Sequence, residues 1–221
     1  MRQFFGIILL FVILPVQAQK FGTGTGSILL EQYGENILKL TYHPAGEQDG
    51  RLYSDAVIGK PGKLSADWQV TRDSAADQVI IGHKSLADSI SIRFFQEAAG
   101  GFRLGLGEKE EIFGGGERAI PMNRRGHRLP LYNAPKYGYA EGAEALNYSV
   151  PLFLGTRGYA LFADNPSRGY ADIGQTGHNI LELGFTGGEL NLYILLGRNM
   201  DEQLQAYSGL TGRQPLPPRW V

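Results

Sequence analysis

Glycine and proline interrupt this chain so frequently that most of its apolar segments are too short for helices. There are 31 glycines and 11 prolines among 221 residues. Between them, several segments place an apolar residue at every second position, which is the pattern of a strand with one buried face. The clearest sets are Leu38, Leu40 and Tyr42; Ile90, Ile92 and Phe94; and Phe102, Leu104 and Leu106. The sequence therefore predicts an all-β fold, a twisted antiparallel sandwich.

Segments 181–185 and 190–194 also alternate, and Thr186-Gly187-Gly188 lies between them. Glycine readily adopts the positive φ angles that short hairpin turns need. We therefore expect the two segments to pair with each other as a β-hairpin.

One short helix is expected near the end of the chain. Asn199 is a capping residue, acidic residues follow it in the first turn, and Gly209 can end the helix. Met200, Leu204 and Tyr207 are spaced to share the apolar face of such a helix.

The first 18 residues are organised like a cleavable signal peptide. Arg2 supplies the positive end, residues 4–16 are apolar, and the small residue Ala18 precedes the expected cleavage point. The alternative is a retained membrane anchor. Against it, the apolar run contains Pro15 and is shorter than the roughly 20 residues of a membrane span. We expect export to the periplasm or the medium, with no membrane attachment after cleavage. The chain contains no cysteine, so no disulfide framework is expected.

The charge of the mature chain favours a neutral ligand. Cleavage after Ala18 removes Arg2 and no acidic residue, so the formal net charge moves from −1 to −2. Lysine and arginine are dispersed, which argues against nucleic acid as a partner. The four histidines, at positions 43, 83, 127 and 178, lack the short spacing of metal ligands, and we expect neither a metal nor a cofactor.

Aromatic and amide side chains gather in one long segment, residues 132–148. Long connections of this composition commonly form binding sites, because flat rings and amides suit the C–H faces and hydroxyls of sugars. The alternative is that several of the tyrosines cover the edge of the sandwich. The residues of interest are Tyr132, Asn133, Tyr137, Tyr139, Glu141, Glu144, Asn147 and Tyr148.

Two other clusters favour structural explanations. Gly114-Gly115-Gly116 lacks the Lys-Ser/Thr of a phosphate loop and is interpreted as a tight backbone approach at the end of a strand. Glu108, Glu110 and Glu111 invite comparison with a glycosidase carboxylate pair, but a solvated, charged turn is the favoured interpretation.

Five motifs then follow one another in an order that resembles a known family. They are Phe113-Gly114-Gly115-Gly116-Glu117-Arg118 with Asn123-Arg124-Arg125-Gly126; Leu131-Tyr132-Asn133; Tyr148-Ser149-Val150-Pro151-Leu152-Phe153; Gly158-Tyr159-Ala160-Leu161-Phe162-Ala163-Asp164-Asn165; and the segment from Tyr207 to Trp220. Together they resemble the N-terminal β-sandwich of glycoside hydrolase family 31, the α-glucosidase and α-xylosidase group.

The resemblance implies a galactose-mutarotase-like sandwich at residues 19–210, with one short C-terminal helix. A Pro-rich junction at 211–221 would lead into a (β/α)8 barrel, where the family's two catalytic aspartates lie. No catalytic residue is then expected in this chain, which would be inactive alone. Its partners would be an oligosaccharide or α-glycoside substrate and its own barrel.

By position, the resemblance implies that Asn133, Tyr139 and Tyr148 contact the sugar from the sandwich side. Many members have an acidic residue soon after this strand, where the chain has Asn133-Ala134-Pro135, so the substrate sugar stays undefined.

Two other functions stay open at this point. One is a stand-alone carbohydrate-binding module with the same sandwich. The other is an aldose epimerase, which needs a general base and a general acid, such as Glu182 with His127 or His178.

Overall fold

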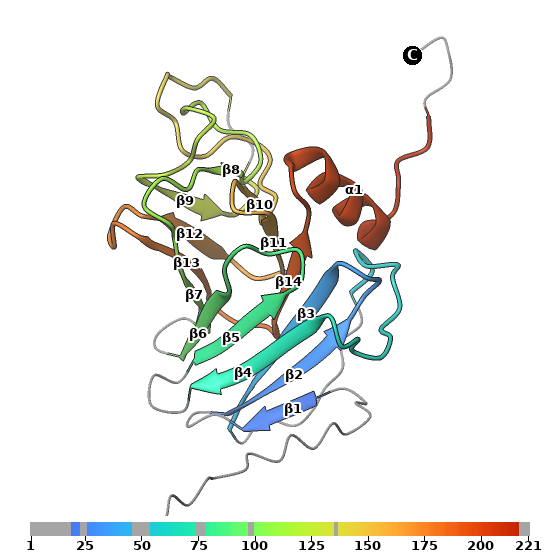
Figure 1. Cartoon of the computed structure of the whole chain (residues 1–221). Helices are drawn as coiled ribbons and strands as arrows, with labels where there is room; N and C mark the ends of the chain where they lie inside the picture. The colour runs from blue at the N-terminus through green and yellow to red at the C-terminus, as the bar shows by residue number, and fades with distance from the viewer. Residues whose placement is uncertain are drawn as a thin grey trace, which may run out of the picture.

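The computed structural model describes residues 19–22, 26–45, 54–73, 78–96, 100–134 and 137–216. In these residues, fourteen strands form two seven-stranded sheets, and one helix packs beside them (Figure 1). The predicted all-β sandwich with one C-terminal helix is confirmed. The predicted signal peptide and residues 217–221 of the predicted junction lie outside the described residues. No helix in the described ranges has the length and hydropathy needed to cross a membrane.

The first sheet carries the helix, and all its strand pairs are antiparallel. In spatial order its strands are β1 (Gln19–Gly22), β2 (Gly26–Gln32), β3 (Ile37–Pro44), β14 (Leu190–Leu196), β11 (Tyr159–Asp164), β10 (Leu152–Gly155) and β8 (Ile112–Gly114).

The second sheet faces it across the core and is also antiparallel throughout. Its strands, in spatial order, are β4 (Trp68–Asp73), β5 (Gln78–His83), β6 (Ile90–Gln96), β7 (Gly100–Gly105), β13 (Ile180–Phe185), β12 (Gly169–Ile173) and β9 (His127–Leu131).

Residues at alternate positions of these strands form the core between the sheets. All nine residues of the three alternating sets from β3, β6 and the β7 region are buried, as their spacing predicts. Burying one such Leu, Ile or Phe side chain contributes about 1.5–3 kcal/mol, so the inner faces supply most of the driving force for folding.

The predicted hairpin of residues 181–185 with 190–194 is wrong. Strand β13 pairs with β7 and β12, whereas β14 pairs with β3 and β11 in the other sheet. The intervening residues, including Gly188 at φ 79°, therefore carry the chain from one sheet to the other. Alternation identifies the buried face of a strand but not its neighbour, and both sheets of a sandwich face the same core.

Helix α1 (Met200–Thr211) begins as predicted, because the Asn199 side chain accepts a 2.9 Å hydrogen bond from the Glu202 N–H. The predicted end is wrong. The helix continues through Gly209 to Gly212, which has φ 93° and donates to the Ser208 carbonyl at 2.9 Å. A glycine inside a helix costs only about 1 kcal/mol, and packing against the sheet outweighs that.

The outer face of the first sheet and α1 enclose a second apolar cluster. Phe162 stacks on Tyr193, with ring centroids 5.8 Å apart, and Tyr207 of α1 meets Phe162 edge-on at 5.2 Å. Leu204, expected on the buried face, is 43% exposed, whereas Leu210 is buried. Met200 and Tyr207 pack against this cluster as predicted, so the buried face of α1 includes Leu210 in place of Leu204.

Candidate functional site

The segment after β8 is shaped by three consecutive glycines with positive φ. A Cβ on Gly114 would lie 2.3 Å from the Leu152 carbonyl oxygen, and one on Gly116 would lie 2.4 Å from that of Tyr148. The Glu117 N–H donates to Tyr148 O at 2.8 Å. The expected tight backbone approach is confirmed, and it holds residues 148–152 directly against the glycines.

Arg118 strengthens this attachment from inside the protein. Its buried guanidinium donates 3.0 Å hydrogen bonds to Pro130 O and to Ser149 Oγ, and a longer one to Tyr148 O at 3.4 Å. Burial lowers the pKa of Arg118, and the charge of Arg124 lowers it further. The sequence analysis included Arg118 only as part of a motif; its role in joining β9 to residues 148–149 depends on contacts between segments distant in the chain.

Asn133 closes the base of the long loop that follows β9. Its side-chain oxygen accepts a 2.6 Å hydrogen bond from the Ser149 N–H. The two ends of the loop, at residues 133 and 149, are thereby joined, and the loop extends beyond the sheets at the top of Figure 1. Asn133 therefore positions the residue next to Tyr148.

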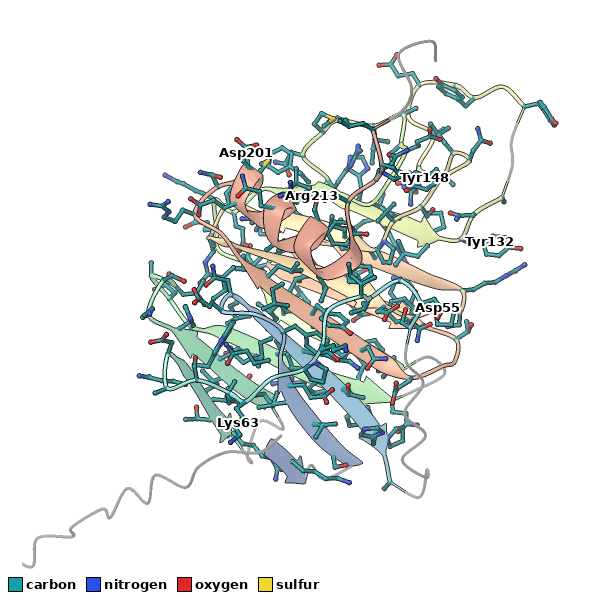
Figure 2. All side chains as sticks on the ribbon, turned by 90° about the vertical axis from the view of Figure 1, so that its right-hand side faces the viewer. Asp55, Lys63, Tyr132, Tyr148, Asp201 and Arg213 are labelled. Atoms are coloured by element: carbon teal, nitrogen blue, oxygen red, sulfur yellow. The ribbon has the colours of Figure 1, made fainter. Side chains whose placement is uncertain are left out.

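A pocket of about 530 Å³ lies beside this loop, between residues 148–151, the end of β11, the start of β14 and helix α1. Figure 2 views the molecule from the side of α1. There, the labelled Tyr148 marks the loop side of the pocket, and the labelled Asp55 marks the side formed by Ser54 and Ala56. Its lining comprises Ser54, Ala56, Tyr148, Ser149, Val150, Pro151, Phe162, Ala163, Asp164, Asn165, Pro166, Gly188, Glu189, Asn191 and Tyr207. Tyr148 is 55% exposed, so part of its side chain is available to a ligand.

The polar part of the pocket centres on Asp164, the last residue of β11. Burial raises the pKa of its carboxyl group, although a 2.9 Å hydrogen bond from Ser54 Oγ and the charge of Lys39 act in the opposite direction. Beside it, Asn191 donates to Glu189 Oε2 at 2.9 Å and accepts from the Thr41 hydroxyl at 2.7 Å. The pocket thus combines aromatic rings, carboxylates and an amide, which can contact the C–H faces and accept from the hydroxyls of a sugar.

The three residues expected to contact sugar lie in different surroundings. Tyr148 lines the pocket, and Asn133 lies at the loop base one hydrogen bond from Ser149. Tyr139 is 67% exposed and is absent from the lining. The sequence analysis missed Asp164 as a site residue. It named Asp164 only as part of the family motif from Gly158 to Asn165.

Glu110 was expected in a solvated turn, and that expectation is wrong. The residue is buried; its Oε2 accepts from the Gly107 N–H at 2.8 Å and lies 3.6 Å from an Arg157 nitrogen. The turn at 107–110 folds the carboxylate back toward Arg157, a contact between segments far apart in the chain. Glu108 and Glu111 are exposed as expected.

The histidine and glutamate considered for epimerase chemistry lie in separate contacts. His127 Nδ1 lies 3.6 Å from Glu144, whereas Glu182 accepts from Arg103 and from the Tyr170 hydroxyl. In the described ranges, no group of three or more histidine or carboxylate side chains is arranged to hold a metal ion.

The sequence matches a known family and several of its members. Residues 91–172 match the sequence model of the glycosyl hydrolase 31 N-terminal galactose mutarotase-like domain. Alpha-glucosidase 2 of Bacillus thermoamyloliquefaciens is 26% identical over 225 residues, covering 91% of this chain and 28% of the relative. Alpha-xylosidase XylQ of Lactiplantibacillus pentosus is 29% identical over 118 residues, covering 53% of this chain and 15% of the relative. The chain thus spans less than a third of the length of each of these relatives.

Solved structures show the same fold. The GH31 dextranase FjDex31A of Flavobacterium johnsoniae, complexed with glucose, has a TM-score of 0.74 and 20% identity, covering 93% of this chain and 29% of that one. A GH31 alpha-xylosidase from a soil metagenome, complexed with xylose, has a TM-score of 0.64 and 18% identity, covering 92% and 35%.

Proposed function

Because the chain carries the N-terminal galactose mutarotase-like domain of glycoside hydrolase family 31, we propose that it is the non-catalytic, carbohydrate-binding part of an exported α-glycosidase. One observation carries the proposal. The Tyr148 side chain lines a pocket that also contains aromatic rings and two carboxylates, beside the base of the loop that residues 133 and 149 close. In this proposal the pocket and the loop contact an α-glycoside, and a following (β/α)8 barrel performs the hydrolysis.

Neighbouring side chains hold the two carboxylates of the pocket in place, which suits a preformed binding surface. Asp164 accepts from Ser54 Oγ, and Glu189 accepts from the Asn191 amide and lies 4.0 Å from His43 Nδ1. Both acids are thus bound to neighbouring side chains.

Export is the second part of the proposal. Its support is the signal-peptide pattern of residues 1–18, with a positive residue, an apolar run and a small residue at the cleavage point. The N-terminal sequence of the secreted or periplasmic protein checks it, and a mature protein that still begins at Met1 would contradict it.

The binding role is tested by activity on α-glycosides, in a protein that carries this chain followed by its natural barrel. Tyr148→Ala is expected to lower kcat/KM by an amount equivalent to about 1–3 kcal/mol of transition-state stabilisation. Tyr137→Ala is the matched control, because Tyr137 belongs to the same loop, is fully exposed and is absent from the pocket. Equal activity of Tyr148→Ala and wild type would contradict the proposal.

The alternative of a stand-alone binding module is tested on the natural polypeptide itself, by measuring both sugar binding and hydrolysis. If the natural polypeptide has no barrel, sugar binding by Tyr148 would persist without any hydrolysis. Sugar binding by the isolated chain together with hydrolysis by the longer protein supports the α-glycosidase domain.

A further inference from the structure

The outer face of the second sheet, away from α1 in Figure 1, carries an ordered row of charged residues. By strand register, one outward-facing residue from each of β6, β7, β13, β12 and β9 stands beside the next. We call this set the arginine row; in spatial order it consists of Arg93, Arg103, Glu182, Asp172 and Arg128.

A second row on the same face, two residues along each strand, places two aromatic rings over a pair of glycines. It contains Gly101 and Gly184, which are paired with each other, between Phe95 and Tyr170. A Cβ on Gly101 would lie 2.7 Å from the Phe95 ring, and one on Gly184 would lie 2.5 Å from the Tyr170 ring. The rings therefore occupy the space that side chains at the glycines would need.

The guanidinium groups of the arginine row stack on these rings. Arg103 Cζ lies 4.3 Å from the Phe95 centroid, and Arg128 Cζ lies 3.8 Å from the Tyr170 centroid. Between them, Glu182 accepts from Arg103 Nε and from the Tyr170 hydroxyl, each at 2.5 Å. The stacking fixes the planes of the two guanidinium groups, so that their donors have defined directions.

The row contains three guanidinium groups and two carboxylates, so positive charge is in excess, and both carboxylates already accept hydrogen bonds. Asp172 accepts from the Thr176 hydroxyl, from the Gln175 N–H and from Arg128 at 3.2 Å. Arg93 is exposed and lies directly opposite Arg103. In the described part of the chain, no hydrogen bond or ion pair involves Arg93. Like charges directly opposite each other in a sheet are destabilising, so an anion between them would be stabilising.

We propose that the arginine row binds an acidic oligosaccharide, in which a uronate carboxylate lies between Arg93 and Arg103. A planar carboxylate matches the paired donors of guanidinium groups. The neighbouring Glu182 and Asp172 would repel a polyanion with a charge on every unit at close spacing, such as a nucleic acid. A chain with one carboxylate per unit and several hydroxyls fits the alternation of donors and acceptors. This site lies on the opposite sheet from the Tyr148 pocket and is independent of the proposed function.

The test is calorimetric titration of the full chain with trigalacturonate at low salt, with maltotriose, inorganic phosphate and an oligoglutamate peptide as comparison ligands. We expect saturable trigalacturonate binding with a Kd on the order of 1 mM, weakening as salt is added. Arg93→Gln should weaken it at least tenfold, and Arg93→Lys should weaken it less. Arg198→Gln is the matched control, since Arg198 is an exposed arginine of the α1 region, and it should bind like wild type.

Tyr148→Ala should leave trigalacturonate binding unchanged, which separates this site from the pocket. The proposal is overturned if wild type shows no saturable trigalacturonate binding, if Tyr148→Ala binds maltotriose as well as it binds trigalacturonate, or if Arg198→Gln loses as much affinity as Arg93→Gln. Tighter binding of phosphate or of oligoglutamate than of trigalacturonate would also overturn it, because the row would then select charge alone.

Discussion

The side-chain oxygen of Asn133 accepts a 2.6 Å hydrogen bond from the backbone N–H of Ser149, sixteen residues later in the chain. Together with the Arg118 bonds to Pro130 O and Ser149 Oγ, this contact joins the two ends of the loop beside Tyr148, which lines the pocket. Asn133 thus helps to position Tyr148 by holding the backbone of the next residue, Ser149.

Replacing Asn133 with Ala removes the acceptor and leaves the Ser149 N–H to water. We expect a loss of about 1 kcal/mol in local stability, seen as faster hydrogen exchange of the Ser149 amide. Asn133→Asp retains an acceptor oxygen and should keep the slower exchange. Equal exchange rates in Asn133→Ala and wild type would show that the loop ends are held by other contacts.

Gly116 and Gly126 provide a matched pair for the tight backbone approach. Both have positive φ, at 89° and 86°, but a Cβ on Gly126 meets no atom within 4 Å, whereas one on Gly116 would lie 2.4 Å from Tyr148 O. Gly126→Ala should cost about 1–2 kcal/mol from backbone strain alone. Gly116→Ala should cost several kcal/mol more, measured by urea unfolding, because the clash displaces residues 148–149. Similar losses for the two variants would contradict this explanation.

Arg118 should contribute strongly to stability, since it donates to three acceptors of other segments. Arg118→Ala removes the donor to Pro130 O and Ser149 Oγ, whereas Tyr148 O still accepts from the Glu117 N–H, and we expect a loss of about 3 kcal/mol. Arg168 stacks on Tyr132 but is exposed, so Arg168→Ala serves as the control and should unfold at nearly the wild-type urea concentration. A similar midpoint for both variants would show that the Arg118 contacts contribute little.

The raised pKa of Asp164 gives a pH-dependent prediction with a definite sign. Burial raises this pKa, so folding favours the protonated carboxyl group. Its contribution to stability is complete below the unfolded pKa, about pH 4, and is lost as the pH rises through the folded value. Asp164→Asn should therefore be more stable than wild type at pH 7 but not at pH 3, and should bind sugar more weakly. A variant less stable than wild type at pH 7 would contradict this assignment.

Residue patterns predicted the faces of the strands better than their partners. Leu38, Leu40 and Tyr42 alternate because burial has a period of two in a strand, and burial alone decides that pattern. The pairing of β13 and β14 depends on which sheet each joins, and a glycine-containing connection permits either arrangement. The start of α1 was predictable from Asn199 because capping is local, whereas its buried face depends on the sheet beneath Leu210.

The candidate site was predictable only in part, for a related reason. The loop composition gave Tyr148 as one of eight residues, and the family resemblance singled it out together with Asn133 and Tyr139. Of these three residues, Tyr148 lines the pocket. Asp164 and Tyr207 join it there from β11 and α1, and only the packing of α1 on the first sheet brings them together. Glu110 was misjudged in the same way, because its partner Arg157 is distant in sequence.

The most direct test of the sugar-binding account is an NMR titration of the isotopically labelled chain with isomaltotriose and maltotriose. The account predicts saturable shifts of the amides of Tyr148, Ser149, Asp164 and Asn191, which are abolished by Tyr148→Ala and retained by Tyr137→Ala. Shifts confined to other surfaces, or equal binding by both variants, would contradict it.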